Sequence, residues 1–277
     1  MTDDLQKKIK QSIRLLQSIK ATEIELCFSG GKDSSVILEL AKMADIPFRA
    51  IYKKTTLDPP GTIAFCRQHG VEIQEPKKTF FELIEDRGFP TRRCRFCCDE
   101  LKEYKILDNS IQGIRRCEST SRAKLYREPI VCRMYGGNKR NHVNIFLPIL
   151  NWTDNDIVDF IAMQKIQCHK LYYDENGNFN VKKRLGCLTC PLQSDKGKSD
   201  FKRYPNFVKQ YIKSGKKWWD KPRIKKARSC EKFESIYDLF VHNVFFDSYE
   251  SFRIAKSGIF GKADCKAFLE DYFKIDL

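Results

Sequence analysis

The chain has 277 residues, of which 42% are hydrophobic and 31% are charged, and its formal net charge at pH 7 is +15. This composition excludes a disordered polymer, and no apolar run approaches the roughly 20 residues of a membrane-spanning helix. The first 20 residues are amphipathic and lack the apolar centre of a signal peptide, so we expect a cytoplasmic protein with no membrane partner.

The excess of cations and the 12 cysteines are the two unusual features of the composition. Positive charge favours partners that carry phosphate, and a cytosolic chain rich in cysteine more often binds metal than forms disulfides. A lysine-rich compositional bias and a set of buried thiols would explain the same figures. Composition alone therefore leaves these alternatives open.

The first part of the chain alternates helices with short apolar strands. Thr79 with Glu82 predicts a capping box at the start of one helix. The expected helices are 5–19, 36–43, 60–69 and 79–87, and the expected strands are 24–28, 48–52 and 71–73. This alternation predicts a parallel sheet with crossover helices.

Beyond Arg92 cysteines and arginines become frequent, and two further strands are expected at 111–116 and 143–149. A helix follows Trp152 and runs to about Met163, with Thr153 or Asp154 as its N-cap. From residue 196 the chain is basic and aromatic, and then mostly helical. We therefore expect an α/β domain at 1–191 and a helical C-terminal region at 192–277.

A glycine-rich turn of sequence SGGKDS occupies residues 29–34, where a predicted strand ends and a helix begins. Such a turn presents free backbone N–H groups and the positive end of a helix dipole, which suits a phosphate. Gly30 and Gly31 permit a positive φ and the close approach of an oxyanion. Lys32 adds a point charge, and Asp33 could hold Mg²⁺ or orient a ligand. The alternative is an ordinary strand-to-helix turn.

Two groups of cysteines have spacings typical of metal ligands. The groups are Cys94, Cys97 and Cys98, and then Cys187 and Cys190. Two such corners complete a tetrahedral zinc site or a cubane cluster. The first corner is either Cys97 with Cys98 or Cys94 with Cys97, and zinc would prefer the second of these. Nearby arginines, Arg184 among them, would stabilise thiolates. The alternative is a set of unrelated buried cysteines.

Arginines also cluster near the end of the expected strand at 111–116, in the stretch from Gly113 to Arg122. Ligands bind at the carboxyl edge of a parallel sheet, and arginine binds phosphate or sulfate through paired hydrogen bonds. Glu118 would hold an arginine in place or bind a ribose. The alternative is a solvated run of charges.

Together these pieces resemble the PAPS reductase family, within the PP-loop adenine nucleotide α-hydrolases. The turn at 29–34 matches the pyrophosphate loop of that family. The other matching segments are 55–62 (its second nucleotide segment), 95–102 (its tandem-cysteine motif), 113–122 (its Gly-x-Arg-x-x-Glu-Ser-x-x-Arg stretch), 148–156 (its next strand and helix start) and 186–191 (its distal cysteine pair). The resemblance covers about residues 20–195.

The resemblance implies a parallel-sheet, Rossmann-type (HUP-like) nucleotide-binding domain with a helical C-terminal part. It implies an adenine nucleotide with Mg²⁺, and catalytic roles for Lys32, Asp33 and Arg115. The implied nucleotide-binding residues are Ser29, Gly30, Gly31, Lys32, Asp33, Ser34, Thr56, Glu118, Ser119 and Arg122. In cysteine-bearing members the two pairs hold a [4Fe-4S] cluster. The ligands so assigned are Cys97, Cys98, Cys187 and Cys190, with Zn²⁺ on a set that includes Cys94 as the alternative.

The sequence departs from the family near its C-terminus. Sulfonucleotide reductases carry a nucleophilic cysteine in a Glu-Cys-Gly-x-His-type tail, whereas Cys265 has no Gly-x-His after it. We therefore expect an ATP-dependent enzyme of sulfur transfer that acts at the α-phosphate, in nucleic-acid thiolation or DNA phosphorothioation with a separate sulfur donor. One alternative is a phosphoadenylyl-sulfate or adenylyl-sulfate reductase, in which Cys265 and a thioredoxin-like reductant make sulfite. The other is a non-catalytic iron–sulfur or zinc module that binds nucleic acid.

Much of the positive charge lies in one tract, residues 196–233, which holds 14 Lys and Arg against 3 Asp and Glu. The aromatic residues among them are Phe201, Tyr204, Phe207, Tyr211, Trp218 and Trp219. This mixture suits phosphate tracking with base stacking, so DNA or RNA is the expected partner. The same aromatics could instead form the packed face of basic surface helices.

Overall fold

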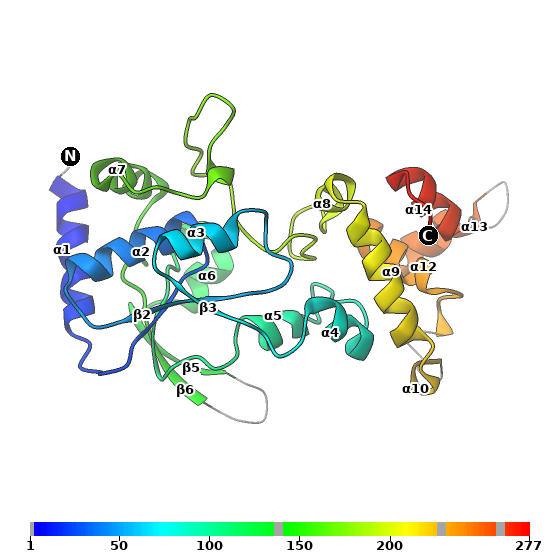
Figure 1. Ribbon diagram of the computed structural model, residues 1–277, viewed down its shortest axis with the longest axis horizontal. Coiled ribbons are helices and arrows are strands. Elements are labelled where there is room, and N and C mark those ends of the chain that lie inside the picture. The colour runs from blue at the N-terminus through cyan, green and yellow to red at the C-terminus, as the bar shows by residue number, and fades with distance from the viewer. Residues whose placement is uncertain (1–2, 136–140, 226–230, 259–263) are drawn as a thin grey trace. The chain divides into compact units, whose positions relative to one another are not determined.

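The computed structural model describes residues 3–135, 141–225, 231–258 and 264–277. The chain forms two compact units (Figure 1). The first comprises Met1–Lys54, Asp58–Pro76 and Asp99–Gly186, and the second comprises Thr55–Leu57, Lys77–Cys98 and Cys187–Leu277. Both units are built from separate segments, whereas the sequence predicts contiguous domains that meet at 191. That boundary stays a prediction about folding domains.

A six-stranded sheet with the strand order β3-β2-β1-β4-β6-β5 is the centre of the first unit. The strands are β1 (Glu25–Cys27), β2 (Arg49–Lys53), β3 (Glu72–Gln74), β4 (Asn109–Ile111), β5 (Ile130–Tyr135) and β6 (Asn141–Phe146). The first four pairings are parallel, which confirms the predicted α/β class. β5 pairs antiparallel with β6 at the edge of the sheet, and the sequence pattern does not predict this strand.

Helices cover the sheet because their apolar residues recur on one face. The helices of this unit are α1 (Asp3–Gln17), α2 (Lys32–Met43), α3 (Thr62–Gln68), α6 (Thr120–Leu125) and α7 (Asp154–Gln164). The larger core joins Leu5, Leu40 and Phe160 of the helices to Leu26 and Ile111 of the sheet. A smaller core contains Val143 and Ile145, which alternate along β6 with Phe146 of the larger core.

Two predicted strands are shorter in the structure. The strand expected at 111–116 ends at Ile111, and Arg116–Glu118 form a 3₁₀ turn. A Cβ atom on Gly113 would lie 3.0 Å from the backbone oxygen of Asp33, so the chain crosses the start of α2 closely here. The strand expected at 143–149 instead covers Asn141–Phe146, and a turn follows in which the Leu150 N–H donates to the oxygen of Leu147.

The second unit is mainly helical, as predicted for the C-terminal part. Its helices are α4 (Phe80–Arg87), α8 (Lys198–Arg203), α9 (Asn206–Trp219), α10 (Pro222–Lys225), α12 (Ile236–Phe245), α13 (Tyr249–Ser257) and α14 (Cys265–Phe273), and α5 (Phe96–Leu101) begins in it. The capping box of Thr79 and Glu82 starts α4, as predicted. Gly215 lets α9 approach Phe89, because a Cβ there would lie 2.5 Å from the ring. No helix among the described residues is long and apolar enough to cross a membrane.

Candidate functional site

The glycine-rich turn leads directly from the end of β1 into α2. Gly30 has a φ of +74°, which favours glycine, and a Cβ there would lie 3.0 Å from Cδ2 of Leu185. Gly31 is the N-cap of α2 and supplies no capping side chain. The hydroxyl of Ser29 donates to that of Ser34 at 3.2 Å and accepts from the N–H of Gly31 at 3.3 Å. The turn therefore joins backbone donors, hydroxyls and a helix N-terminus, the combination that binds phosphate.

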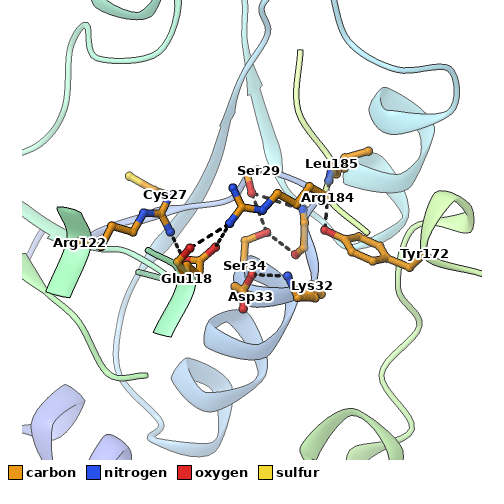
Figure 2. A pocket seen from close by; sticks show the side chains of 12 residues that line it. Cys27, Ser29, Lys32, Asp33, Ser34, Glu118, Arg122, Tyr172, Arg184 and Leu185 are labelled. Carbon is orange, nitrogen blue, oxygen red and sulfur yellow. Dashed lines mark hydrogen bonds and ion pairs between the residues drawn. The ribbon is translucent and has the colours of Figure 1, made fainter. Parts of the chain in front are cut away.

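A cavity of about 210 Å³ lies at this turn (Figure 2). Its lining consists of Cys27, Ser29, Gly31, Lys32, Asp33, Ser34, Gly113, Glu118, Arg122, Tyr172, Arg184 and Leu185. The structure thus brings most of the predicted nucleotide-binding residues together. Ser119 instead caps α6 by accepting a hydrogen bond from the Arg122 N–H, and Thr56 belongs to the second unit.

A chain of ion pairs holds the charged residues of the turn in place. Lys32 is 4% exposed, and its Nζ lies 3.0 Å from Oδ2 of Asp33 and 5.7 Å from the centre of the Tyr172 ring. Nε of Arg115 donates to Oδ1 of Asp33 at 2.7 Å, and its Nη2 donates to Oδ1 of Asp154 at 2.9 Å. Lys32 is therefore fixed beside the cavity by a carboxylate that is itself held from behind.

Arg115 lies behind Asp33 and does not line the cavity, although it is a predicted catalytic residue. It is only 1% exposed. Burial lowers the pKa of its guanidinium, but Asp33 and Asp154 together raise that pKa above its ordinary value. The side chain therefore stays charged, and the geometry gives it a positioning role toward Asp33.

Glu118 forms a second charged group on the cavity wall. Its carboxylate pairs closely with Arg122, and Nη2 of Arg184 lies 3.9 Å from its Oε1. Burial and the neighbouring charge of Arg184 lower the pKa of Arg122. The prediction that Glu118 would hold an arginine matches this arrangement. The guanidinium of Arg184 reaches Glu118 (Figure 2), and its expected role beside the thiolates stays a prediction.

Sequence reasoning did not select Tyr172, Leu185 or Arg184 for this cavity. The hydroxyl of Tyr172 accepts a hydrogen bond from the Leu185 N–H at 3.3 Å, and Leu185 packs against Gly30. These residues are more than 130 positions from the turn and carry no local motif of phosphate binding. Arg184 stands out in the sequence only because it lies close to the distal cysteine pair, and this proximity predicts a role beside the thiolates.

The four cysteines implied as cluster ligands all belong to the second unit. A hydrogen bond with Cys98 raises the pKa of the Cys97 thiol, and burial and the charges of Cys98, Cys187 and Cys190 raise it further. Cys98, Cys187 and Cys190 thus all act on the charge of Cys97. Cys94 is exposed, whereas those four are half-buried. Within the described residues, no group of three or more His, Cys, Asp or Glu side chains is arranged to hold a metal ion.

The chemistry of this donor set is nevertheless uniform. Four thiols without a carboxylate or imidazole suit zinc or an iron–sulfur cluster, so the residue types fit the implied group. Arg92 supports the distal pair through the backbone, because its guanidinium donates to the oxygens of Pro191 at 3.0 Å and Gln193 at 2.9 Å.

In the basic tract, aromatic packing accounts for several of the rings. Phe201 and Tyr211 are 1% and 4% exposed, so they belong to the core of the second unit and do not offer stacking surfaces. Trp218 lies against Gly88, where a Cβ would be 2.8 Å from the indole. Lysines at 209, 213, 216 and 217 of α9 are exposed. Lys217 pairs with Glu85 at 2.8 Å, and Nζ of Lys216 lies 5.0 Å from the centre of the Tyr237 ring. Residues 226–230 of the tract lie outside the described residues.

Comparison with known proteins gives matches along most of the chain. The sequence model of the phosphoadenosine phosphosulfate reductase domain matches residues 23–193. An uncharacterized protein of Methanocaldococcus jannaschii is 32% identical over 209 residues, which are 68% of this chain and 48% of that protein. The chain thus spans about half the length of this relative.

Sulfate adenylyltransferase subunit 2 of Shewanella pealeana is 29% identical over 205 residues, which are 61% of this chain and 67% of that protein. Among solved structures, the U34-tRNA thiolase NcsA from Methanococcus maripaludis with its [4Fe-4S] cluster has a TM-score of 0.39 at 14% identity. That match covers 80% of this chain and 81% of the other.

Proposed function

Because the chain belongs to the phosphoadenosine phosphosulfate reductase domain family, we propose that it binds an adenine nucleotide on the turn at 29–34 and acts at its α-phosphate. One observation carries this proposal. The cavity at the turn combines the N-terminus of α2, two serine hydroxyls and the buried ammonium of Lys32. These groups are donors or positive charges, and they converge on a space suited to a pyrophosphate group.

With ATP as the substrate, an acceptor oxygen would attack the α-phosphorus and form a new P–O bond. The bond between the α-phosphorus and the bridging oxygen would break, and pyrophosphate would leave with that bond's electron pair. Lys32 and the N–H groups of α2 would stabilise the growing negative charge. Asp33 and Arg115 would keep Lys32 in position. A sulfur donor would then replace the adenylylated oxygen and release AMP, and Mg²⁺ would arrive with the nucleotide.

The alternative sulfonucleotide reductase has less support in the environment of Cys265. A reductase needs a thiolate to take sulfur from the nucleotide. Cys265 is buried at the start of α14, and burial together with the hydrogen bond to Asp238 raises the pKa of its thiol to about 12. A thiol in this state is protonated at neutral pH and is a poor nucleophile.

The cysteine cluster is the proposed site of the metal group. Cys97 and Cys98 would bind a [4Fe-4S] cluster together with Cys187 and Cys190. When bound, such a cluster would supply an iron site for sulfur or would fix the fold around it. Zinc on a set that includes Cys94 is the alternative, and the exposure of Cys94 favours it less.

Nucleic acid is the proposed acceptor of sulfur. The exposed lysines of α9 support this partner by their charge, since phosphate contacts supply most non-specific affinity for DNA or RNA. Phe201 and Tyr211 are packed in the core, so these two rings are not available to stack on bases. The proposal therefore rests on contacts between lysines and the phosphates of the nucleic-acid backbone, and not on the recognition of bases.

One pair of assays discriminates between these functions. The full chain, reconstituted with iron and sulfide without oxygen, is incubated with ATP, Mg²⁺ and DNA or tRNA as the acceptor, and separately with PAPS or APS plus a thiol reductant. We expect pyrophosphate from ATP and no sulfite. Sulfite release that Cys265→Ser abolishes, with ATP inert, would overturn the proposal in favour of the reductase. The absence of both products would leave a non-catalytic module.

A further inference from the structure

Arg184 extends over the cavity from a position next to Leu185, and its guanidinium faces Glu118 (Figure 2). Its Nη2 lies 3.9 Å from the Glu118 carboxylate and donates to the Glu118 backbone oxygen at 3.4 Å. These contacts are long, and the side chain is 68% exposed. The head of Arg184 is therefore held loosely while it lines the cavity.

The backbone that carries Arg184 is, in contrast, fixed against the glycine-rich turn. The N–H of Leu185 donates to the Tyr172 hydroxyl at 3.3 Å, and the Leu185 side chain packs against Gly30. Tyr172 in turn lies beside the ammonium of Lys32. The guanidinium can therefore change partners without any rearrangement of the turn.

Glu118 is the anion that the two arginines of the cavity share. Its carboxylate is 12% exposed and lies between Arg122 and Arg184, which approach it from opposite sides in Figure 2. Burial and then the charge of Arg184 lower the pKa of Arg122, and the two guanidiniums repel one another across this carboxylate. A polyphosphate offers more negative charge than one carboxylate, and its oxygens match the guanidinium fork.

We propose that Arg184 is a further substrate-binding residue, which closes over the pyrophosphate portion of a nucleotide held on the turn at 29–34. In this arrangement Glu118 occupies Arg184 when the nucleotide is absent and competes with the phosphate for it. The inference rests on the proposed function, and it adds a residue to the site together with an antagonist of binding.

Inorganic pyrophosphate and adenosine are the probes of this inference, titrated into the full chain by calorimetry. Arg184→Met should weaken pyrophosphate binding about tenfold or more, the scale of a lost charge-assisted hydrogen bond, and should leave adenosine binding unchanged. Lys124→Met is the matched control, because Lys124 is an exposed cation of α6 that does not line the cavity. It should change the affinity by less than about twofold, as expected of an exposed surface charge.

The Glu118→Gln variant tests whether Glu118 competes with pyrophosphate for Arg184 or supports the binding of pyrophosphate. The amide keeps an oxygen for the backbone N–H of Arg115 but loses the charge, so pyrophosphate should bind more tightly than to the wild-type chain. Equal affinities of the Arg184 and Lys124 variants would overturn the inference and leave the proposed function intact. Weaker binding by Glu118→Gln would overturn the competing role of Glu118. A wild-type chain that binds neither pyrophosphate nor ATP would overturn the proposed function itself.

Discussion

The cavity at the turn 29–34 in the first unit and the four thiols of Cys97, Cys98, Cys187 and Cys190 in the second are both polar, but their charges are stabilised differently. In the cavity each charge has an opposite partner, from Lys32 through Asp33 to Arg115 and Asp154. Among the four thiols, Cys98, Cys187 and Cys190 all raise the pKa of Cys97, so they oppose the ionisation of that thiol. The charges of the first site therefore balance within the protein, whereas the thiols of the second would become stable thiolates on binding a cation.

The two sites therefore differ in the kind of ligand that would stabilise them. Fixed donors lower the cost of binding an anion, since little reorganisation remains to be done. Clustered thiols gain their favourable interactions only when they lose protons to a metal. We therefore expect single substitutions in the cavity to affect turnover, and single substitutions in the cluster to affect metal content.

The largest effect is expected from the removal of the buried charge in the cavity. Lys32→Met should lower the rate of pyrophosphate release from ATP by about 10²–10³-fold, the scale for losing one group that stabilises charge in the transition state. Lys42→Met, on the exposed part of the same helix, is the control and should keep the wild-type rate. Initial rates at saturating ATP are measured for both variants. Equal rates would show that Lys32 has no role in the reaction.

The cluster should respond through metal content. Cys97→Ser should lose most of the bound iron or zinc after anaerobic reconstitution, because a thiolate ligand is replaced by a weak one. Cys94→Ser should retain it, since Cys94 is exposed and lies outside the four half-buried thiols. Metal analysis of the purified variants gives the result. Loss of metal from Cys94→Ser with retention in Cys98→Ser would instead favour the zinc set.

A smaller effect, on folding, should follow from the shape of the glycine-rich turn. Gly30→Ala should lower the free energy of unfolding by about 1–2 kcal/mol for the positive φ, with a further cost for the contact with Leu185. Gly177→Ala isolates the first part, because Gly177 has a φ of +80° and a Cβ there would meet nothing within 4 Å. Urea denaturation compares the two variants. Equal losses in the free energy of unfolding would mean that the Leu185 side chain moves away from the new Cβ without a measurable cost.

The smallest effect is a pH dependence in the second unit. Burial raises the pKa of Asp238, but Lys256, Cys265 and the Glu234 backbone N–H together hold that pKa below its ordinary value. A carboxyl group with a lowered folded pKa adds stability above the unfolded pKa near 4, and this stability is lost as the pH falls through the folded value. Urea denaturation between pH 6 and pH 3 should show that Asp238→Asn flattens this decline. Glu250→Gln, in an exposed pair with Arg253, should not, and a change as large as that of Asp238→Asn would contradict the account.

Local sequence patterns were sufficient for much of the fold and for the centre of the site. Short apolar runs and helical spacing predicted β1, β2 and β3 with their crossover helices, and the string at 29–34 predicted the turn. β5 escaped notice because an edge strand with one exposed face carries a weak apolar pattern. The early end of β4 depends on a contact between Gly113 and the start of α2, which no local pattern encodes.

The same limit applies to individual site residues. Arg115 is part of a motif, but its place behind Asp33 is decided by the carboxylate of Asp154 from a distant helix. Tyr172 and Arg184 join the cavity only because the chain returns there after α7. Their roles depend on tertiary contacts, so spacing along the chain could not reveal them.

The central claim is that the chain acts at the α-phosphate of a nucleotide held on the turn at 29–34. Incubation with ATP labelled at the α-phosphate, followed by separation of the products, tests it directly. We expect labelled AMP, or AMP attached to an acceptor, together with pyrophosphate, and the loss of both in Lys32→Met. Labelled ADP with free phosphate as the products would place the chemistry at the γ-phosphate and would contradict the account.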